Sequence, residues 1–161
     1  MTCMNPLDNK EVLVKITKYC AYQDRCKKEV YNKLDTILPD ITQQDIIIDY
    51  LIKEKYLDED RYVQSIVRGK FFHKNWGKIK IRHFLHQKNI STFTIEETIA
   101  REIKDKDYRT KAYELVASKW KTTQGQNDFE IKQKILSSLY QKGYKSELIL
   151  DVLHDFINDL T

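Results

Sequence analysis

KIRHFL at residues 80–85 indicates the fold, because its pattern of apolar residues recurs as EVYNKL at 29–34 and as KILSSL at 134–139. Each copy carries an apolar residue at its second and sixth positions. Residues four apart lie on one face of an α-helix, so Ile81 and Leu85 mark a helical face that packs inward. Three copies in one chain predict an internal repeat of helical units.

A second helical segment follows each copy after a short break. These segments begin at Ile41, Ile90 and Tyr144, which lie 49 and 54 residues apart. Each shows the one-sided apolar spacing of an amphipathic helix. Further helical patterns at 60–73 and 105–120 lie between the copies. Each repeating unit is therefore predicted to hold three helices.

The composition agrees with an all-α fold. The chain has 161 residues with only 4 Gly and 2 Pro, and it lacks the alternation of Val, Ile and Thr that half-buried strands need. We predict three tandem three-helix modules that form an elongated, curved array. Their predicted limits are 1–57, 58–104 and 105–161.

Residues that end or begin helices separate the predicted segments. Pro39 interrupts one connection, and Gly143 stands where a helix C-terminus favours a residue that tolerates positive φ. Asn89 occupies the equivalent position in the middle module. The segment 122–127 is polar and is expected to be an exposed loop, and Asp128 is expected to cap the helix that follows.

Membrane insertion and secretion are not expected from this sequence. The longest apolar run, at 46–48, is far shorter than a membrane span, and the N-terminus has no charged region followed by an apolar stretch. We therefore expect a cytoplasmic protein. Cys3, Cys20 and Cys26 form no CxxC pair, which argues against a disulfide framework or a zinc site. Cys20 and Cys26 both fall in predicted helices and are expected to be reduced thiols.

The sequence carries none of the common signatures of catalysis. It has no phosphate-binding glycine loop, no GxSxG nucleophile motif and no HExxH motif. The acids at 58–60 fit a helix start, where carboxylates complement the helix dipole. His83 and His86 have the spacing of a ligand pair, but no Cys or carboxylate nearby completes a metal site. We predict a non-enzymatic binding protein without a metal or cofactor.

Positive charge is concentrated in the middle of the chain. The formal net charge is +4, yet residues 61–95 contain no Asp or Glu. Lys78, Arg82 and His86 follow helical spacing and are predicted to form a basic stripe, with an ordinary solvated helix face as the alternative. The candidate binding residues are the Lys and Arg of this stretch: Arg61, Arg68, Lys70, Lys74, Lys78, Lys80, Arg82 and Lys88.

Aromatic residues interleave with these charges. Phe71, Phe72 and Trp76 lie between the candidate cations. Such a pattern is compatible with base stacking, but aromatic residues at helical spacing more often belong to a hydrophobic core. We therefore expect these three rings to be core residues.

Several segments in a fixed order resemble the RecX family. The run YLDEDRYV at 56–63 is followed by KNWG at 74–77, KNI at 88–90 and YQKGY at 140–144. Upstream, Cys26 stands where that family usually has a serine, and Asn89 replaces its usual glycine. The resemblance extends over nearly the whole chain.

This resemblance implies a monomeric cytoplasmic regulator of the RecA recombinase. Such a protein would lie along the RecA filament on single-stranded DNA, and would inhibit strand exchange, ATP hydrolysis and co-protease activity in DNA repair, recombination and the SOS response. Weak direct binding to DNA is a further expectation. Two alternatives stay open from the residues alone. One is a helical, sequence-specific DNA-binding transcriptional regulator, and the other is a helical-repeat adaptor for another protein.

Overall fold

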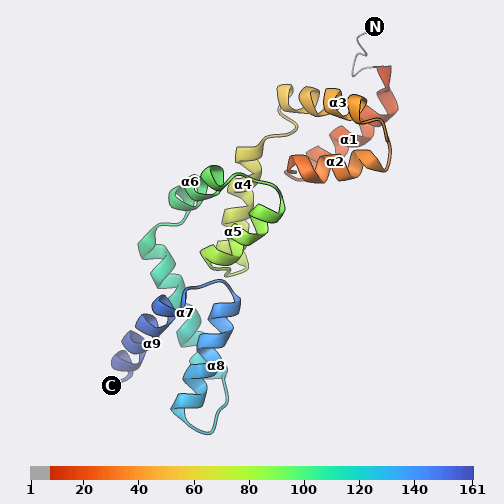
Figure 1. Ribbon diagram of the computed structural model, residues 1–161. Coiled ribbons are helices and arrows are strands. Elements are labelled where there is room, and N and C mark those ends of the chain that lie inside the picture. The colour runs from red at the N-terminus through yellow and green to blue at the C-terminus, as the bar shows by residue number, and fades with distance from the viewer. Residues whose placement is uncertain (1–7) are drawn as a thin grey trace. The chain divides into compact units, whose positions relative to one another are not determined.

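The computed structural model describes residues 8–161, and all regular secondary structure within this range is helical (Figure 1). The predicted all-α class is confirmed. The helices are α1 (Lys10–Tyr22), α2 (Lys27–Asp35), α3 (Ile41–Lys53), α4 (Glu59–Arg68), the π-helical turn η2 (Gly69–His73), α5 (Lys78–Gln87), α6 (Thr92–Glu102), α7 (Asp105–Thr122), α8 (Asp128–Gln141) and α9 (Ser146–Leu160).

The chain forms two compact units that divide between Ser65 and Ile66, inside α4. In the first unit, α1, α2 and α3 enclose an apolar core. Its one buried polar side chain among the described residues is Gln44, whose amide donates to the Leu38 carbonyl at 2.7 Å and to the Asp35 carboxylate at 2.9 Å. Burial of this amide is tolerated because both of its hydrogen atoms have acceptors.

The second unit contains η2 and α5 to α9. The pairs Ile81/Leu85 and Ile135/Leu139 from the repeated stretches are fully buried here, as Val30 and Leu34 are in the first unit. Each pair lies one turn apart on its helix and therefore faces the core, as predicted. Burial of one such side chain contributes about 2 kcal/mol.

The helix ends follow the sequence signals in two places and depart from them in two. Asn89 and Gly143 have φ of 61° and 95°, the left-handed conformation predicted for both. Asp128 is not the cap of α8, because the Asn127 side chain accepts the Glu130 amide at 2.9 Å. Cys26 precedes α2 as its N-cap instead of lying within a helix.

The two other cysteines are Cys20, which the structure describes, and Cys3, which it does not. Cys20 lies in α1 and is buried, as expected for a helical residue. Burial, the largest influence, raises the pKa of its thiol to about 11. The thiol is therefore protonated and a poor nucleophile near neutral pH. Cys3 lies outside the described residues.

The end of the 60–73 segment is not α-helical. After Arg68 the α-helix changes into the wider π-helical turn η2. The turn ends with hydrogen bonds from the Lys74 amide to the Gly69 carbonyl and from the Trp76 amide to the Lys70 carbonyl. Phe71 of this turn is fully buried, whereas Phe72 is 45% exposed. The core expectation is confirmed for Phe71 and is wrong for Phe72. Such π-helical turns are rare and occur often at functional sites.

Candidate functional site

The start of α5 is joined to the turn between α8 and α9 (Figure 1). The Gly77 amide donates to the Lys142 carbonyl at 2.7 Å, and the Ile79 amide donates to the Gly143 carbonyl at 3.1 Å. The first amides of a helix have no acceptor within the helix itself. The α8–α9 turn therefore caps α5, and we call this contact the glycine joint.

Two glycines allow the backbones to come this close. A Cβ atom on Gly77 would lie 2.2 Å from the Gly143 carbonyl oxygen, and one on Gly143 would lie 2.5 Å from the Lys80 Cβ. Both distances are well inside van der Waals contact. Glycine is required at both positions, and at Gly143 its positive φ adds a second reason.

A stacked pair of tyrosines lies beside the glycine joint. Tyr108 of α7 and Tyr144 have ring centroids 5.1 Å apart and nearly parallel planes. The Tyr108 hydroxyl accepts the Lys78 amide at 3.1 Å, and the Tyr144 hydroxyl donates to the Asn75 carbonyl at 3.2 Å. Burial raises the pKa of both phenols. The tyrosines therefore stay neutral and extend the contact between α5 and the C-terminal helices.

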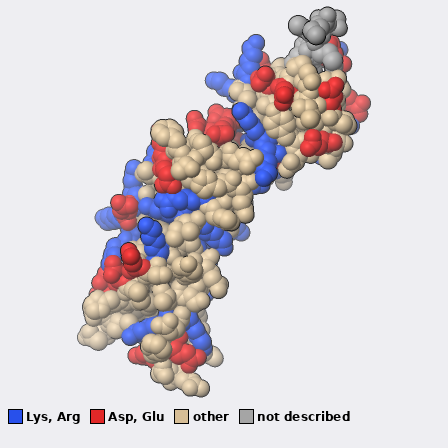
Figure 2. All heavy atoms as spheres, in the orientation of Figure 1, with Lys and Arg blue, Asp and Glu red and all other residues tan. Residues whose placement is uncertain are grey.

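Ion pairs hold four of the predicted binding residues. The pairs are Arg61–Asp24 (2.6 Å), Arg68–Glu102 (3.3 Å), Lys78–Asp105 (3.3 Å) and Arg82–Glu96 (2.5 Å). Figure 2 shows the result as acidic side chains interspersed with basic ones over α5 to α7. These four cations hold helices together and present less free charge than the sequence suggests.

The Arg82–Glu96 ion pair is bidentate. Two nitrogens of the guanidinium donate to the two carboxylate oxygens, at 2.5 and 2.9 Å. This hydrogen bonding keeps the pKa of Glu96 below its ordinary value. Lys78 and His86 also act on Glu96 electrostatically. The predicted stripe of Lys78, Arg82 and His86 thus lies near a carboxylate that comes directly after the acid-free stretch.

A different group of lysines lies on aromatic rings. Lys70 Nζ is 4.5 Å from the Trp76 ring centre and 4.9 Å from that of Phe84, and Lys80 Nζ is 4.5 Å from Trp76. Lys88 Nζ is 5.5 Å from Phe84. A ring attracts an ammonium group but does not neutralise its charge, so Lys70 and Lys80 keep theirs. We call these five residues the lysine–aromatic platform.

Two further lysines lie in the turn that forms the glycine joint. The Lys142 carbonyl accepts the Gly77 amide, and Lys145 is the N-cap residue of α9. Sequence reasoning missed both lysines because they lie outside the acid-free stretch. The KG-aromatic turn at 142–144 was the available signal. Lys74 is exposed at the end of η2, and Arg61 belongs to the first unit.

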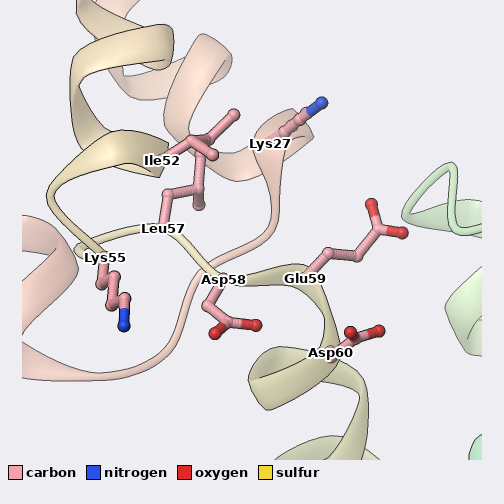
Figure 3. A pocket seen from close by; sticks show the side chains of 7 residues that line it. All are labelled: Lys27, Ile52, Lys55, Leu57, Asp58, Glu59 and Asp60. Carbon is pink, nitrogen blue, oxygen red and sulfur yellow. The ribbon is translucent and has the colours of Figure 1, made fainter.

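The first unit has a pocket of 480 Å³ at the start of α4 (Figure 3). Ile52 and Leu57 form its apolar side, and the acids at 58–60 lie along its edge. The Asp58 carboxylate accepts the Arg61 amide at 3.0 Å, which confirms the predicted helix start. Capping accounts for Asp58, and no cluster of three metal-binding side chains occurs within residues 8–161.

None of the helices in the described part of the chain has both the length and the apolar character needed to cross a membrane. The helices and their buried repeats define an all-α protein with tandem three-helix domains. Comparison with known proteins agrees with this class. Residues 58–99 match the second three-helix domain of RecX, and residues 107–153 match the third. Together these matches cover more than half of the chain.

Known relatives carry the same family name. The regulatory protein RecX of Staphylococcus epidermidis is 31% identical over 146 residues, which are 88% of this chain and 53% of that protein. The regulatory protein RecX of Clostridium botulinum is 29% identical over 158 residues, with 94% and 73% covered. The chain spans about half the length of the staphylococcal relatives that it matches.

Solved structures show the same fold. The crystal structure of RecX from Lactobacillus salivarius superposes with a TM-score of 0.82 at 24% identity, covering 96% of this chain and 98% of that one. Another structure of a regulatory protein RecX gives a TM-score of 0.80 at 22% identity, with 91% of this chain and 71% of that chain covered. The chain belongs to the RecX family of regulatory proteins.

Proposed function

We propose that this protein binds the RecA filament on single-stranded DNA and inhibits its ATP hydrolysis, strand exchange and co-protease activities. The observation that carries the proposal is the consecutive match of residues 58–99 and 107–153 to the second and third RecX domains. The protein would act as a monomer in the cytoplasm and modulate DNA repair and recombination without catalysis of its own.

The modular division is part of this proposal. The first module would comprise 1–57, the second 58–104 and the third 105–161. The helix triplets α1–α3, α4–α6 and α7–α9 fit these limits, although the compact units divide later, inside α4. The second module would carry the main contacts with the filament, because it holds the eight candidate cations.

The contacts of these cations within the protein would decide which of them bind the filament. Lys78 and Arg82 would fix α5 against α6 and α7, since both are ion-paired. Lys70 and Lys80 would meet the anionic filament, because their charges lie over rings and not beside carboxylates. Lys74, which is exposed, would add to this surface. Long-range attraction between opposite charges would speed association with the filament.

The decisive test is RecA-dependent ATP hydrolysis on single-stranded DNA, titrated with this protein. We expect hydrolysis to fall in a saturable manner as the protein is added. A variant carrying Lys70→Gln and Lys80→Gln should need a higher concentration for the same inhibition. Hydrolysis that stays unchanged at saturating concentrations of the folded wild-type protein would refute the proposal.

A further inference from the structure

Each of the helix triplets α1–α3, α4–α6 and α7–α9 has a groove beside its second and third helices. The repeated stretches at 29–34, 80–85 and 134–139 start 51 and 54 residues apart, and the N-cap residues of α3, α6 and α9 keep the same intervals. In this register one lysine of the second helix and one isoleucine near the end of the third line every groove: Lys27 and Ile52, Lys78 and Ile103, Lys132 and Ile157. The three grooves are therefore equivalent sites of one repeat.

The first helix of the following triplet lines two of these grooves. Glu59 and Asp60, at the start of α4, line the groove of α2 and α3 (Figure 3). Asp105 is the first residue of α7 and lines the groove of α5 and α6, where its carboxylate lies 3.3 Å from Lys78 Nζ. In both grooves the occupant is the acidic start of a triplet's first helix.

The third groove is open. Its lining residues all come from α8 and α9, and it has a volume of 270 Å³. Phe129 and Leu150 on its walls are 70% and 53% exposed. Apolar side chains gathered in an exposed groove mark a surface that a partner covers.

The lining of the third groove is also more apolar than that of its equivalents. In the first triplet the Tyr31 hydroxyl donates to the Asp45 carboxylate at 2.7 Å, and in the second Arg82 pairs with Glu96 at the same positions of the repeat. The corresponding residues of the third triplet are Leu136 and Leu150. A polar bridge between the second and third helices is thus replaced by two leucines where no following helix lines the groove.

The helices α1 and α9 carry opposite charge. α9 has no Lys or Arg and has an acid at every fourth residue: Glu147, Asp151, Asp155 and Asp159. α1 has three lysines and one glutamate. Its exposed face alternates basic and apolar residues four positions apart: Lys10, Val14, Lys18 and Tyr22. Opposite charges on two surfaces favour their association and fix its direction.

We propose that the start of α1 from a second copy of this chain occupies the α8–α9 groove, so that each groove takes the α1 of the next copy. Glu11 lies in the first turn of α1 and meets Lys132, as the acidic helix starts do in the other two grooves. Val14 is 51% exposed and packs one turn later against Phe129 and Leu150. The lysines of α1 then lie opposite the acids of α9.

The two surfaces of this contact differ, so two copies do not close on each other and further copies can add to the free groove. A helix start in a short groove makes a small interface, and such interfaces are weak. Dilute protein therefore stays monomeric. Neighbouring copies on a filament would bind cooperatively, a setting that rests on the proposed function, whereas the contact itself requires no RecA.

Sedimentation velocity of the full chain tests the contact at concentrations from about 1 μM to about 1 mM. The weight-average sedimentation coefficient should rise with concentration and continue past the value of a dimer. Leu136→Arg with Leu150→Glu copies the Arg82–Glu96 pair into the third groove, so this variant should fold and should weaken association about tenfold or more. Phe93→Gln is the matched control, because it removes a 77% exposed ring from α6, outside the groove, and should leave association unchanged.

A charge swap identifies the two surfaces that meet. Glu11→Lys and Lys132→Glu each place like charges in the contact, so each variant alone should associate less than the wild-type protein. An equimolar mixture of the two variants restores opposite charges at residues 11 and 132 of neighbouring copies and should recover association. Glu11 has an exposed ion pair with Lys15 at 2.9 Å, whose loss costs the fold little.

Three results would overturn the inference: wild-type protein that stays monomeric over the whole range, association that the folded groove variant leaves unchanged, or a mixture of the charge variants that recovers nothing. Recovery in the mixture but in neither variant alone would support it, because only contact between different copies gives that pattern. Inhibition of RecA by a protein that never associates would leave the proposed function standing. Association without inhibition would leave this inference standing.

Discussion

Replacement of Gly77 by alanine tests the glycine joint most directly. The new Cβ would lie 2.2 Å from the Gly143 carbonyl oxygen, and the next atoms it meets, at 2.3 and 2.6 Å, are also backbone. No side-chain rotation relieves such a contact. The α8–α9 turn must therefore retreat by about 1 Å to reach ordinary van der Waals distance.

The cost follows from the hydrogen bonds that this retreat breaks. The bonds from the Gly77 and Ile79 amides, at 2.7 and 3.1 Å, both join α5 to the retreating turn, as does the 3.2 Å bond from the Tyr144 hydroxyl to Asn75. At about 1 kcal/mol each, their loss removes roughly 3 kcal/mol from the free energy of unfolding of the second unit. For a unit of this size the midpoint of thermal unfolding should fall by roughly 10 °C or more.

Two measurements check this expectation. Calorimetry gives the change in unfolding midpoint, and hydrogen exchange should show faster exchange at residue 77 and at Ile79, whose amides lose their acceptors. Gly69→Ala is the matched control, because nothing lies within 4 Å of a Cβ at Gly69. That variant should be neutral or gain up to about 1 kcal/mol from a less flexible unfolded chain. Equal stability of the two variants would refute the joint as described.

Three other expectations concern single contacts. Loss of the Arg82–Glu96 pair by Glu96→Gln should cost at most about 1 kcal/mol because both side chains are partly exposed. Arg82 lowers the pKa of Glu96 in the folded state, so this stabilisation is present above the unfolded pKa and disappears as pH falls through the folded pKa. In acid, the free energy of unfolding measured in urea should therefore depend less on pH for Glu96→Gln than for the wild-type protein. Tyr144→Phe removes the hydrogen bond to the Asn75 carbonyl and should lower the free energy of unfolding by about 1 kcal/mol, as measured by thermal unfolding. An unchanged free energy of unfolding would show that only burial of the ring contributes. The thiol of Cys20 has a pKa raised to about 11, so it should resist alkylation in the native protein at pH 8 and react after denaturation. Mass spectrometry of the digested protein would measure alkylation of the peptide that contains Cys20.

Local signals predicted the helices well. The apolar pairs at 30/34, 81/85 and 135/139 face the core because residues four apart share a helix face. Asn89 and Gly143 adopt positive φ, which their residue types tolerate. Local competition explains the wrong cap predicted for α8. Asn127 and Asp128 are both good caps, and the sequence alone does not decide which carboxylate or amide reaches the free amides.

The candidate site was only partly predictable. The acid-free stretch ends one residue before Glu96, which approaches Arg82 from another helix. Asp105 approaches Lys78 from still farther along the chain. The pairing of these charges depends on how the helices cross, and helical periodicity carries no information about that crossing. An estimate of free positive charge from the sequence was therefore too high.

The helical class, the positions at which helices end and the excess positive charge in the middle of the chain can be read from the sequence. These properties depend on residues within a few positions of one another. The approach of Gly77 to Gly143, the tryptophan ring shared by Lys70 and Lys80, and the ion pairs of the cations depend on the tertiary fold. These contacts join residues from different helices, and they form only when the packing of buried side chains fixes the distance between the helices.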